Sequence, residues 1–217
     1  MVDKTFVCLS KSLKNKDYCI AGKIIAEDGT IGEWIRPINK FGSINDEDCG
    51  YQDGTTATTL HIISATFLKP NPQRFQTENH TIDSRYHWEY VNDYDRESLD
   101  ELCDTPETLW FNNNQSGGGK NDQVSPVEAR ELNHSLYFIH VGKLTIHTSK
   151  WDDNFKVRGE FTYNEICYNL KVTDIYWREY YQKKDLGSYV HPNAYVTVSL
   201  ALDVFNGFHY KIIADIL

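Results

Sequence analysis

The sequence predicts an all-β protein with a few short helices, of the kind that folds into β-barrels or a β-sandwich. Aromatic residues make up 13% of the 217 residues, and aromatic side chains favour the half-buried surfaces of sheets. Runs rich in β-branched residues recur along the whole chain and are separated by turn signals such as Asp28-Gly29. Chains with many short strands and Gly-rich turns fold as sandwiches or barrels.

The first half of the chain predicts five strands. The second of these contains Gly22, which is typical of a bulge or a tight bend at a barrel corner. Pro37 ends the third strand, because proline cannot donate a ladder hydrogen bond. The five predicted strands span residues 5–10, 18–25, 32–38, 58–68 and 74–82.

Three features in the middle of the chain interrupt the strands. Residues 92–104 predict a helix, since Leu99, Leu102 and Cys103 share one face. Residues 111–123 are rich in Asn, Gly and Gln and predict a flexible loop. This loop contains GGGK, but it lacks the Ser or Thr after the lysine that a phosphate-binding P-loop requires.

A short helix is predicted directly after this loop. Ser125 fits its N-cap, Pro126 its first position and Glu128 the third position of a capping box. The remaining chain predicts strands, with Asn164-Glu165 as one hairpin turn. These strands span residues 135–148, 156–163, 166–174, 195–202 and 208–217.

Composition excludes several classes of protein. The net charge of −9 and the pI near 5.3 argue against a protein that coats DNA non-specifically. Five cysteines without C-x-x-C spacing, and scattered histidines, predict reduced thiols and no metal site. No apolar run is long enough to cross a membrane, and the first residues lack the apolar core of a secretory signal. We therefore expect a cytoplasmic protein.

No arrangement of residues predicts a catalytic mechanism. A G-x-S-x-G nucleophile elbow is absent. Cys8 and Cys19 fall in predicted strands, where a buried structural thiol is the usual state. We therefore assign no catalytic residue and expect no cofactor.

Two groups of candidate binding residues lie in the first half of the chain. Trp34 and Arg36 share one face of a strand, and with Lys23 they could grip a nucleotide by stacking and charge. The same pattern fits side chains that seal the rim of a barrel. The second group, with amides and a carboxylate that could read base edges or cap a turn, comprises Arg74, Gln76, Glu78 and Asn79.

A third candidate group lies in residues 175–185. This stretch combines aromatic rings with cations, as stacking on bases requires. The alternative is a loop whose aromatic residues cover the end of a barrel. The residues selected here are Trp177, Arg178 and Lys183.

Seven stretches, in order, resemble the dual OB-containing domain family of prokaryotes. That family shows C-x-A-G, W-I-R-P and Q-x-E-N elements, a late run ending in V-T-D, and two terminal strands. The matching stretches are CIAGK (19–23), GEWIRPI (32–38), FQTEN (75–79), SLYFI (135–139), FTYNEICYNLKVTD (161–174), VTVSLAL (196–202) and FHYKIIADIL (208–217).

The resemblance implies two packed OB-like β-barrels. We expect the first barrel at residues 1–110 with a helical insertion near 94–104, a linker at 111–124 and the second barrel at 125–217. The family brings no established catalytic residues. Its motif positions correspond here to Cys19, Gly22, Trp34, Arg36, Gln76, Glu78, Asn79 and Asp174.

Three functions follow as hypotheses. The first, implied by the resemblance, is binding of single-stranded nucleic acid or a nucleotide in an anti-phage or mobile-element setting. OB barrels bind such ligands on strands 2 and 3 and the adjoining loops. The second is a nucleic-acid-processing enzyme that uses Glu78 with Gln76 and His80. The third is a protein-interaction module of a larger complex, with a protein partner and no membrane contact.

Overall fold

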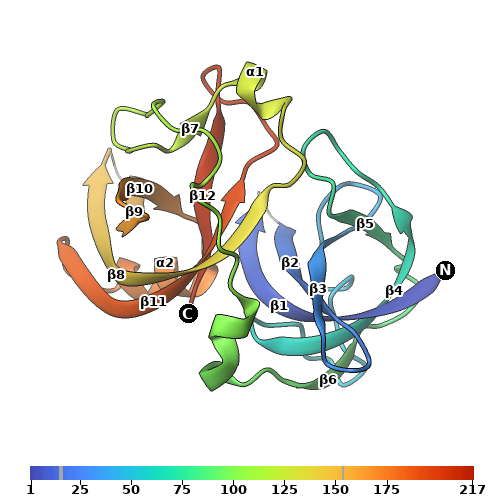
Figure 1. The fold of residues 1–217 in the computed structure, drawn as a ribbon. Helices are drawn as coiled ribbons and strands as arrows, with labels where there is room; N and C mark the ends of the chain where they lie inside the picture. The colour runs from blue at the N-terminus through green and yellow to red at the C-terminus, as the bar shows by residue number, and fades with distance from the viewer. Residues whose placement is uncertain (15–16, 153) are drawn as a thin grey trace. The chain divides into compact units, whose positions relative to one another are not determined.

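The computed structural model describes residues 1–14, 17–152 and 154–217, and confirms the all-β fold. The chain forms two compact units, Met1–Leu102 and Cys103–Leu217. Each unit contains one six-stranded sheet. In Figure 1 the first unit runs from blue to green and the second from green to red.

The sheet of the first unit closes into a barrel. Its strands pair in the order β1-β2-β3-β5-β4, and β4 pairs again with β1. The β3–β5 pairing is parallel, and β6 is added to β4 as an edge strand. The strands are β1 (Val2–Lys14), β2 (Asp17–Ile25), β3 (Ile31–Ile38), β4 (His61–Pro70), β5 (Asn79–Ile82) and β6 (Glu89–Asp93).

The second unit repeats this connectivity. Its strands pair in the order β8-β9-β10-β12-β11, β11 pairs back to β8, and the β10–β12 pairing is parallel. A helix, α2 (Ile175–Gln182), connects the third and fourth barrel strands. The strands are β7 (Gln123–Val124), β8 (Leu136–Trp151), β9 (Asn154–Tyr163), β10 (Ile166–Val172), β11 (Ser188–Leu200) and β12 (His209–Ile216). Two five-stranded barrels of the OB type are therefore present.

Aromatic rings fill the core of the first barrel. Phe6 lies edge-on to Trp88, with ring centroids 5.8 Å apart at 83°, and both side chains are buried. The predicted bend at Gly22 has a steric reason, because a Cβ there would lie 2.0 Å from the Val7 carbonyl oxygen. Only glycine permits this approach of β2 to β1.

The two short helices predicted from the sequence differ in outcome. The capping box before α1 (Pro126–Ala129) is confirmed, since Ser125 and Glu128 exchange the expected hydrogen bonds. The helix expected at 92–104 is a 3₁₀ helix, η1 (Arg96–Leu102), and the first residues of that range belong to β6. Leu99 and Leu102 are buried as the pattern required.

Two expected boundaries differ from the structure. The units meet at Leu102–Cys103, earlier than residue 110. Residues 103–124 belong to the second unit because specific hydrogen bonds attach them to it. The Tyr168 hydroxyl contacts Thr108 Oγ1 and Leu109 N, and Lys211 Nζ donates to the Phe111 carbonyl. The strand expected at 74–82 begins only at Asn79, and the preceding residues form the β4–β5 loop.

Candidate functional site

Arg36 of the first barrel lies in a buried ion pair. Its Nη2 donates to Glu78 Oε1 at 3.1 Å, and its Nη1 donates to Cys19 Sγ at 3.3 Å. The side chains of Arg36 and Glu78 are only 5% and 4% exposed. This guanidinium is therefore bound by the protein itself.

The β4–β5 loop carries the carboxylate to this position. Arg36 N donates to Glu78 O at 2.9 Å, and Arg36 pairs with Asn79 in the parallel β3–β5 ladder. The C-x-A-G, W-I-R-P and Q-x-E-N stretches thus meet around one guanidinium. Gln76 and Asn79 of the same stretch are buried, whereas Arg74 is exposed with a φ of 54°. Buried amides present no edge to a base, so this cluster suits a structural role.

Trp34 and Lys23 lie on neighbouring strands of the same barrel. They pair in the β2–β3 ladder, with Lys23 Nζ 5.6 Å from the ring centroid. Trp34 is half-buried and Lys23 is buried. The ring and the ammonium therefore contact each other, which leaves little of either for a ligand.

A surface groove of about 810 Å³ lies elsewhere on the first unit. It includes Ser64 and Thr66 of β4, and Arg85, Tyr86 and Glu89 after β5. None of the candidate residues selected from the sequence lines it. Its charges are mixed, which identifies no ligand class.

Cations gather on strands 2 and 3 of the second barrel. Arg158 of β9 lies directly opposite Lys171 of β10, and Lys156 precedes Arg158 by two residues on the same face. Lys156 and Lys171 are exposed, and Arg178 of α2 is half-buried. Partial burial and the charges of Arg178, Arg158 and Lys156 lower the pKa of Lys171. These four side chains form the basic strip.

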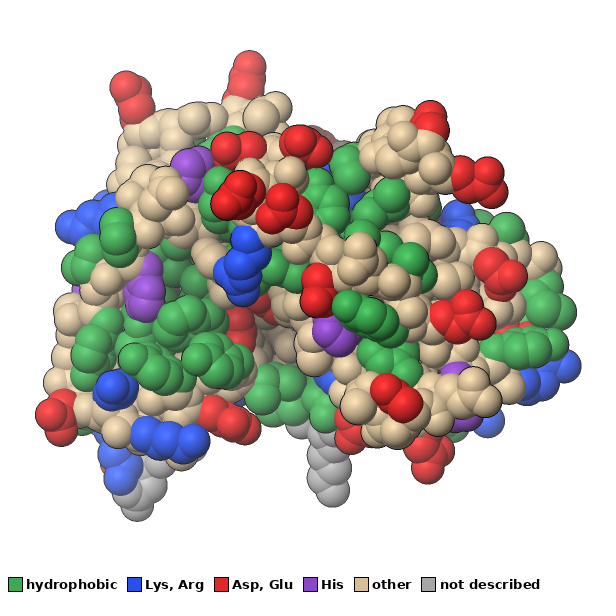
Figure 2. Space-filling view, turned by 90° about the horizontal axis from the view of Figure 1, so that it is seen from below, with side chains coloured by type: hydrophobic (Ala, Val, Ile, Leu, Met, Phe, Trp, Pro, Cys, Tyr) green, Lys and Arg blue, Asp and Glu red, His purple; other side chains and the backbone are tan. Residues whose placement is uncertain are grey.

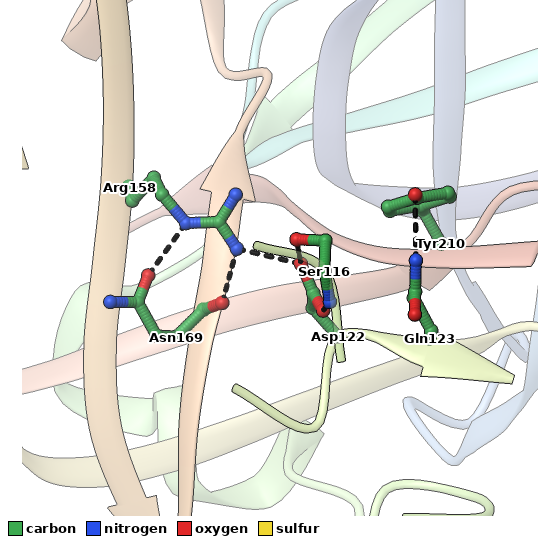
Figure 3. Close-up of polar contacts among 6 residues, drawn as sticks. All are labelled: Ser116, Asp122, Gln123, Arg158, Asn169 and Tyr210. Atoms are coloured by element: carbon green, nitrogen blue, oxygen red, sulfur yellow. Dashed lines mark hydrogen bonds and ion pairs between the residues drawn. The ribbon is translucent and has the colours of Figure 1, made fainter. Parts of the chain in front are cut away.

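One member of the basic strip is already paired. Arg158 Nη2 donates to Asp122 Oδ2 at 2.8 Å, and Arg158 Nε donates to Asn169 Oδ1 at 2.7 Å. Figure 3 shows Asp122 between Arg158 and Ser116. Ser116 donates two hydrogen bonds to the Asp122 carboxylate, through its backbone N and its Oγ. Among the residues that the structure describes, none forms an ion pair with Lys156, Lys171 or Arg178, whereas Arg158 is paired with Asp122.

Helix α2, which carries Arg178 of the basic strip, also carries exposed aromatic rings. Tyr176 and Tyr180 are 66% and 39% exposed, with ring planes 20° apart. Lys184 Nζ lies 4.9 Å from the Tyr180 ring centroid, and Lys183 is exposed at the C-cap. Figure 2 shows hydrophobic side chains gathered at the left of the view, in the second unit, with Lys and Arg beside them.

Trp177, selected from the sequence, makes contacts within the second unit. Its Nε1 donates to the Ile216 carbonyl at 2.9 Å, and its ring stacks on buried Tyr181. Asp174 caps the helix by accepting from Trp177 N, and also accepts from Ile216 N. Burial raises the pKa of Asp174 to about 6.

Sequence reasoning missed Lys156, Arg158, Lys171 and Tyr176. The signal for the first three was present, because a hairpin that turns at Asn164-Glu165 places residue 158 opposite residue 171. Tyr176 could have been found from its position four residues before Tyr180 on a helix.

The described part of the chain shows no cluster of three or more His, Cys, Asp or Glu that could hold a metal ion. Among its helices, none is long and apolar enough to span a bilayer.

The family model of the dual OB-containing domain matches residues 4–216, a range that includes both barrels. No curated protein matches the chain, and neither does any solved structure.

Proposed function

The chain belongs to the dual OB-containing domain family, and from this premise we propose that it binds single-stranded nucleic acid across its second barrel. The observation that carries the proposal is the basic strip on strands β9 and β10 of an otherwise acidic protein. In OB folds this face takes oligonucleotides. Lys156, Lys171 and Arg178 would contact phosphates there.

Aromatic rings would supply the second part of the interaction. Tyr176 and Tyr180 are exposed on α2, whose Arg178 contributes to the electrostatic environment of Lys171. Bases stack on such rings with little sequence preference, at roughly 1–3 kcal/mol per base. Trp151 adds a 71% exposed ring at the β8–β9 turn, the loop that adjoins the ligand face in OB folds.

Salt dependence provides a quantitative test. Each phosphate contact to a single strand contributes about −0.7 to the slope of log K against log salt. Three contacts therefore predict a slope of about −2, or a roughly twenty-fold loss of affinity between 50 and 200 mM salt. Fluorescence anisotropy with 5′-fluorescein-labelled dT15 and rU15 measures both quantities.

Charge reversal locates the site. Lys156→Glu combined with Lys171→Glu should weaken binding by at least about tenfold and flatten the salt slope, because two phosphate contacts are lost. Arg130→Glu is the matched control, since this exposed cation lies outside the strip. Equal binding by the double variant and the control, at every salt concentration, would contradict the proposal.

The enzymatic alternative has less support. A metal-dependent nuclease needs several converging carboxylates, and the Glu78 carboxylate is bound to Arg36. This alternative would be excluded if the wild type cleaves no oligonucleotide and Glu78→Gln still binds the oligonucleotide. The anti-phage or mobile-element setting is part of our proposal, and plaque counts with wild type and the double strip variant test it.

A further inference from the structure

Residues 111–124 lie along the seam of the second barrel, next to the basic strip. Lys120 exchanges two backbone hydrogen bonds with Asn169 of β10, at 3.2 and 3.0 Å. On the other side, Lys211 N of β12 donates to Asp122 O at 2.9 Å. The segment occupies this position because β10 and β12 pair directly at only two positions, Lys171 with Ile212 and Val172 with Ile213.

The segment inserts a carboxylate against the basic strip. The Asp122 side chain is 1% exposed, and its oxygens accept from Ser116 N at 2.8 Å, Ser116 Oγ at 2.6 Å and Arg158 Nη2 at 2.8 Å. The Arg158 side chain remains 21% exposed. A ligand on the outer face of β9 can therefore reach the guanidinium, but meets it already paired (Figure 3).

The glycines of the segment have different surroundings. A Cβ on Gly119 would lie 1.8 Å from Asp122 Oδ2 and 2.5 Å from Arg158 Nη2. No heavy atom lies within 4 Å of a Cβ built on Gly117 or Gly118. Among these three glycines, only Gly119 lies against the ion pair, and the Cβ positions of Gly117 and Gly118 are open.

We propose that Asp122 is an intrachain competitor for Arg158, because its carboxylate takes up guanidinium charge that a phosphate of a bound strand would otherwise use on the second barrel. The inference rests on the proposed function and concerns the same site: Asp122 limits how much Arg158 contributes to ligand binding. A carboxylate and a phosphate both form charge-assisted hydrogen bonds with a guanidinium, and here Arg158 Nη2 donates to Asp122 Oδ2. Arg158 therefore contributes little to binding while Asp122 holds it, and adds one phosphate contact when the carboxylate is removed.

A double-mutant cycle on the full chain tests this. The variants are Asp122→Asn, Arg158→Gln and the pair, measured with 5′-fluorescein-labelled dT15 by anisotropy across a salt series. Asp122→Asn should bind more tightly and steepen the salt slope by about 0.7, the value for one added contact to a single strand. Arg158→Gln alone should stay within about twofold of wild type, and it should abolish the gain in the double variant.

Three results would overturn the proposal. The first is that the Asp122→Asn variant folds but binds dT15 with the affinity and the salt slope of the wild type. Another is a gain that survives Arg158→Gln. The third is a loss in Arg158→Gln as large as that in Lys171→Gln, which would mean that the ligand uses Arg158 despite Asp122. This last comparison decides the matter even if Asp122→Asn fails to fold, which circular dichroism would show.

Failure of the proposed function has a different signature. In that case neither the wild type nor Asp122→Asn binds dT15 or rU15 at 50 mM salt. If the wild type does not bind these oligonucleotides but Asp122→Asn does, the result would instead support Asp122 as a competitor that blocks binding completely, that is, as an autoinhibitory contact.

Discussion

Glu78→Gln should destabilise the first unit strongly, because it removes the carboxylate that forms an ion pair with the buried Arg36 guanidinium. The amide can still accept one hydrogen bond, but it carries no charge to balance the buried guanidinium. The effect is on the folding of the barrel, not on a ligand.

The magnitude follows from burial and geometry. The pair is 3.1 Å apart with side chains 5% and 4% exposed, and breaking a buried pair of this kind costs about 3–5 kcal/mol. For a unit of about 100 residues, each kcal/mol lowers Tm by about 4–8 °C. We therefore expect the first unit to melt at least about 12 °C lower.

The assay must separate the two units, since a two-unit chain need not unfold in one step. Hydrogen exchange on peptides from residues 17–38 and 61–82 reports on the first barrel, and urea denaturation gives the free energy of unfolding. Glu33→Gln is the matched control, because this glutamate is exposed on the same strand as Arg36. It should change stability by less than about 0.5 kcal/mol.

Two outcomes would refute this reasoning. One is a destabilisation below about 1 kcal/mol in Glu78→Gln, the range of an exposed pair. The other is a paired Arg36→Met and Glu78→Leu variant that is no more stable than either single variant. Apolar residues of similar volume normally recover most of the loss.

Three further predictions concern the second unit. Gly119→Ala should destabilise it by about 1–3 kcal/mol, because the new Cβ collides with the Asp122–Arg158 pair; urea denaturation should show no comparable loss in Gly117→Ala. Burial lowers the pKa of Lys211 to about 7. Between pH 7 and pH 9 the unfolded chain therefore binds more protons than the folded chain, so the free energy of unfolding rises with pH. The rise should be about 2 kcal/mol larger than in Lys211→Met. An equal change in the free energy of unfolding of the wild type and Lys211→Met between pH 7 and pH 9 would contradict this pKa. Glu165 has a φ of 66° at the β9–β10 turn, so Glu165→Gly should raise stability by about 1 kcal/mol, and an unchanged or lower Tm would disagree.

Local signals predicted elements that depend on neighbouring residues. The capping box at Ser125 and Glu128 and the Asn164-Glu165 hairpin are both present as expected, because their hydrogen bonds lie within a few residues. The helix expected at 92–104 was only partly right, since its first residues pair with β4 instead. Pairing with a distant strand leaves no mark in a local apolar pattern.

The candidate site was less predictable than the fold. Trp34 and Arg36 do follow one another on alternate positions of β3, but the sequence does not say that the β4–β5 loop brings Glu78 onto the guanidinium. Residues 111–123 show a similar limit. Their composition indicated a flexible loop, whereas hydrogen bonds to β10 and β12 hold them in the seam of the barrel.

The order of residue types was enough to predict the all-β class, the hairpin and turn positions, and the ordered family pattern that both halves share. These depend on residue type and short-range spacing. Which charged residues face solvent and which face each other depends on contacts between segments that are distant in the chain, so it became apparent only from the fold. Arg36 and Arg158 are similar in sequence context, yet a carboxylate lies on each, from residue 78 and residue 122. The local β9–β10 hairpin places Lys171 opposite Arg158, but only the packing of α2 brings Arg178 close enough to act on Lys171.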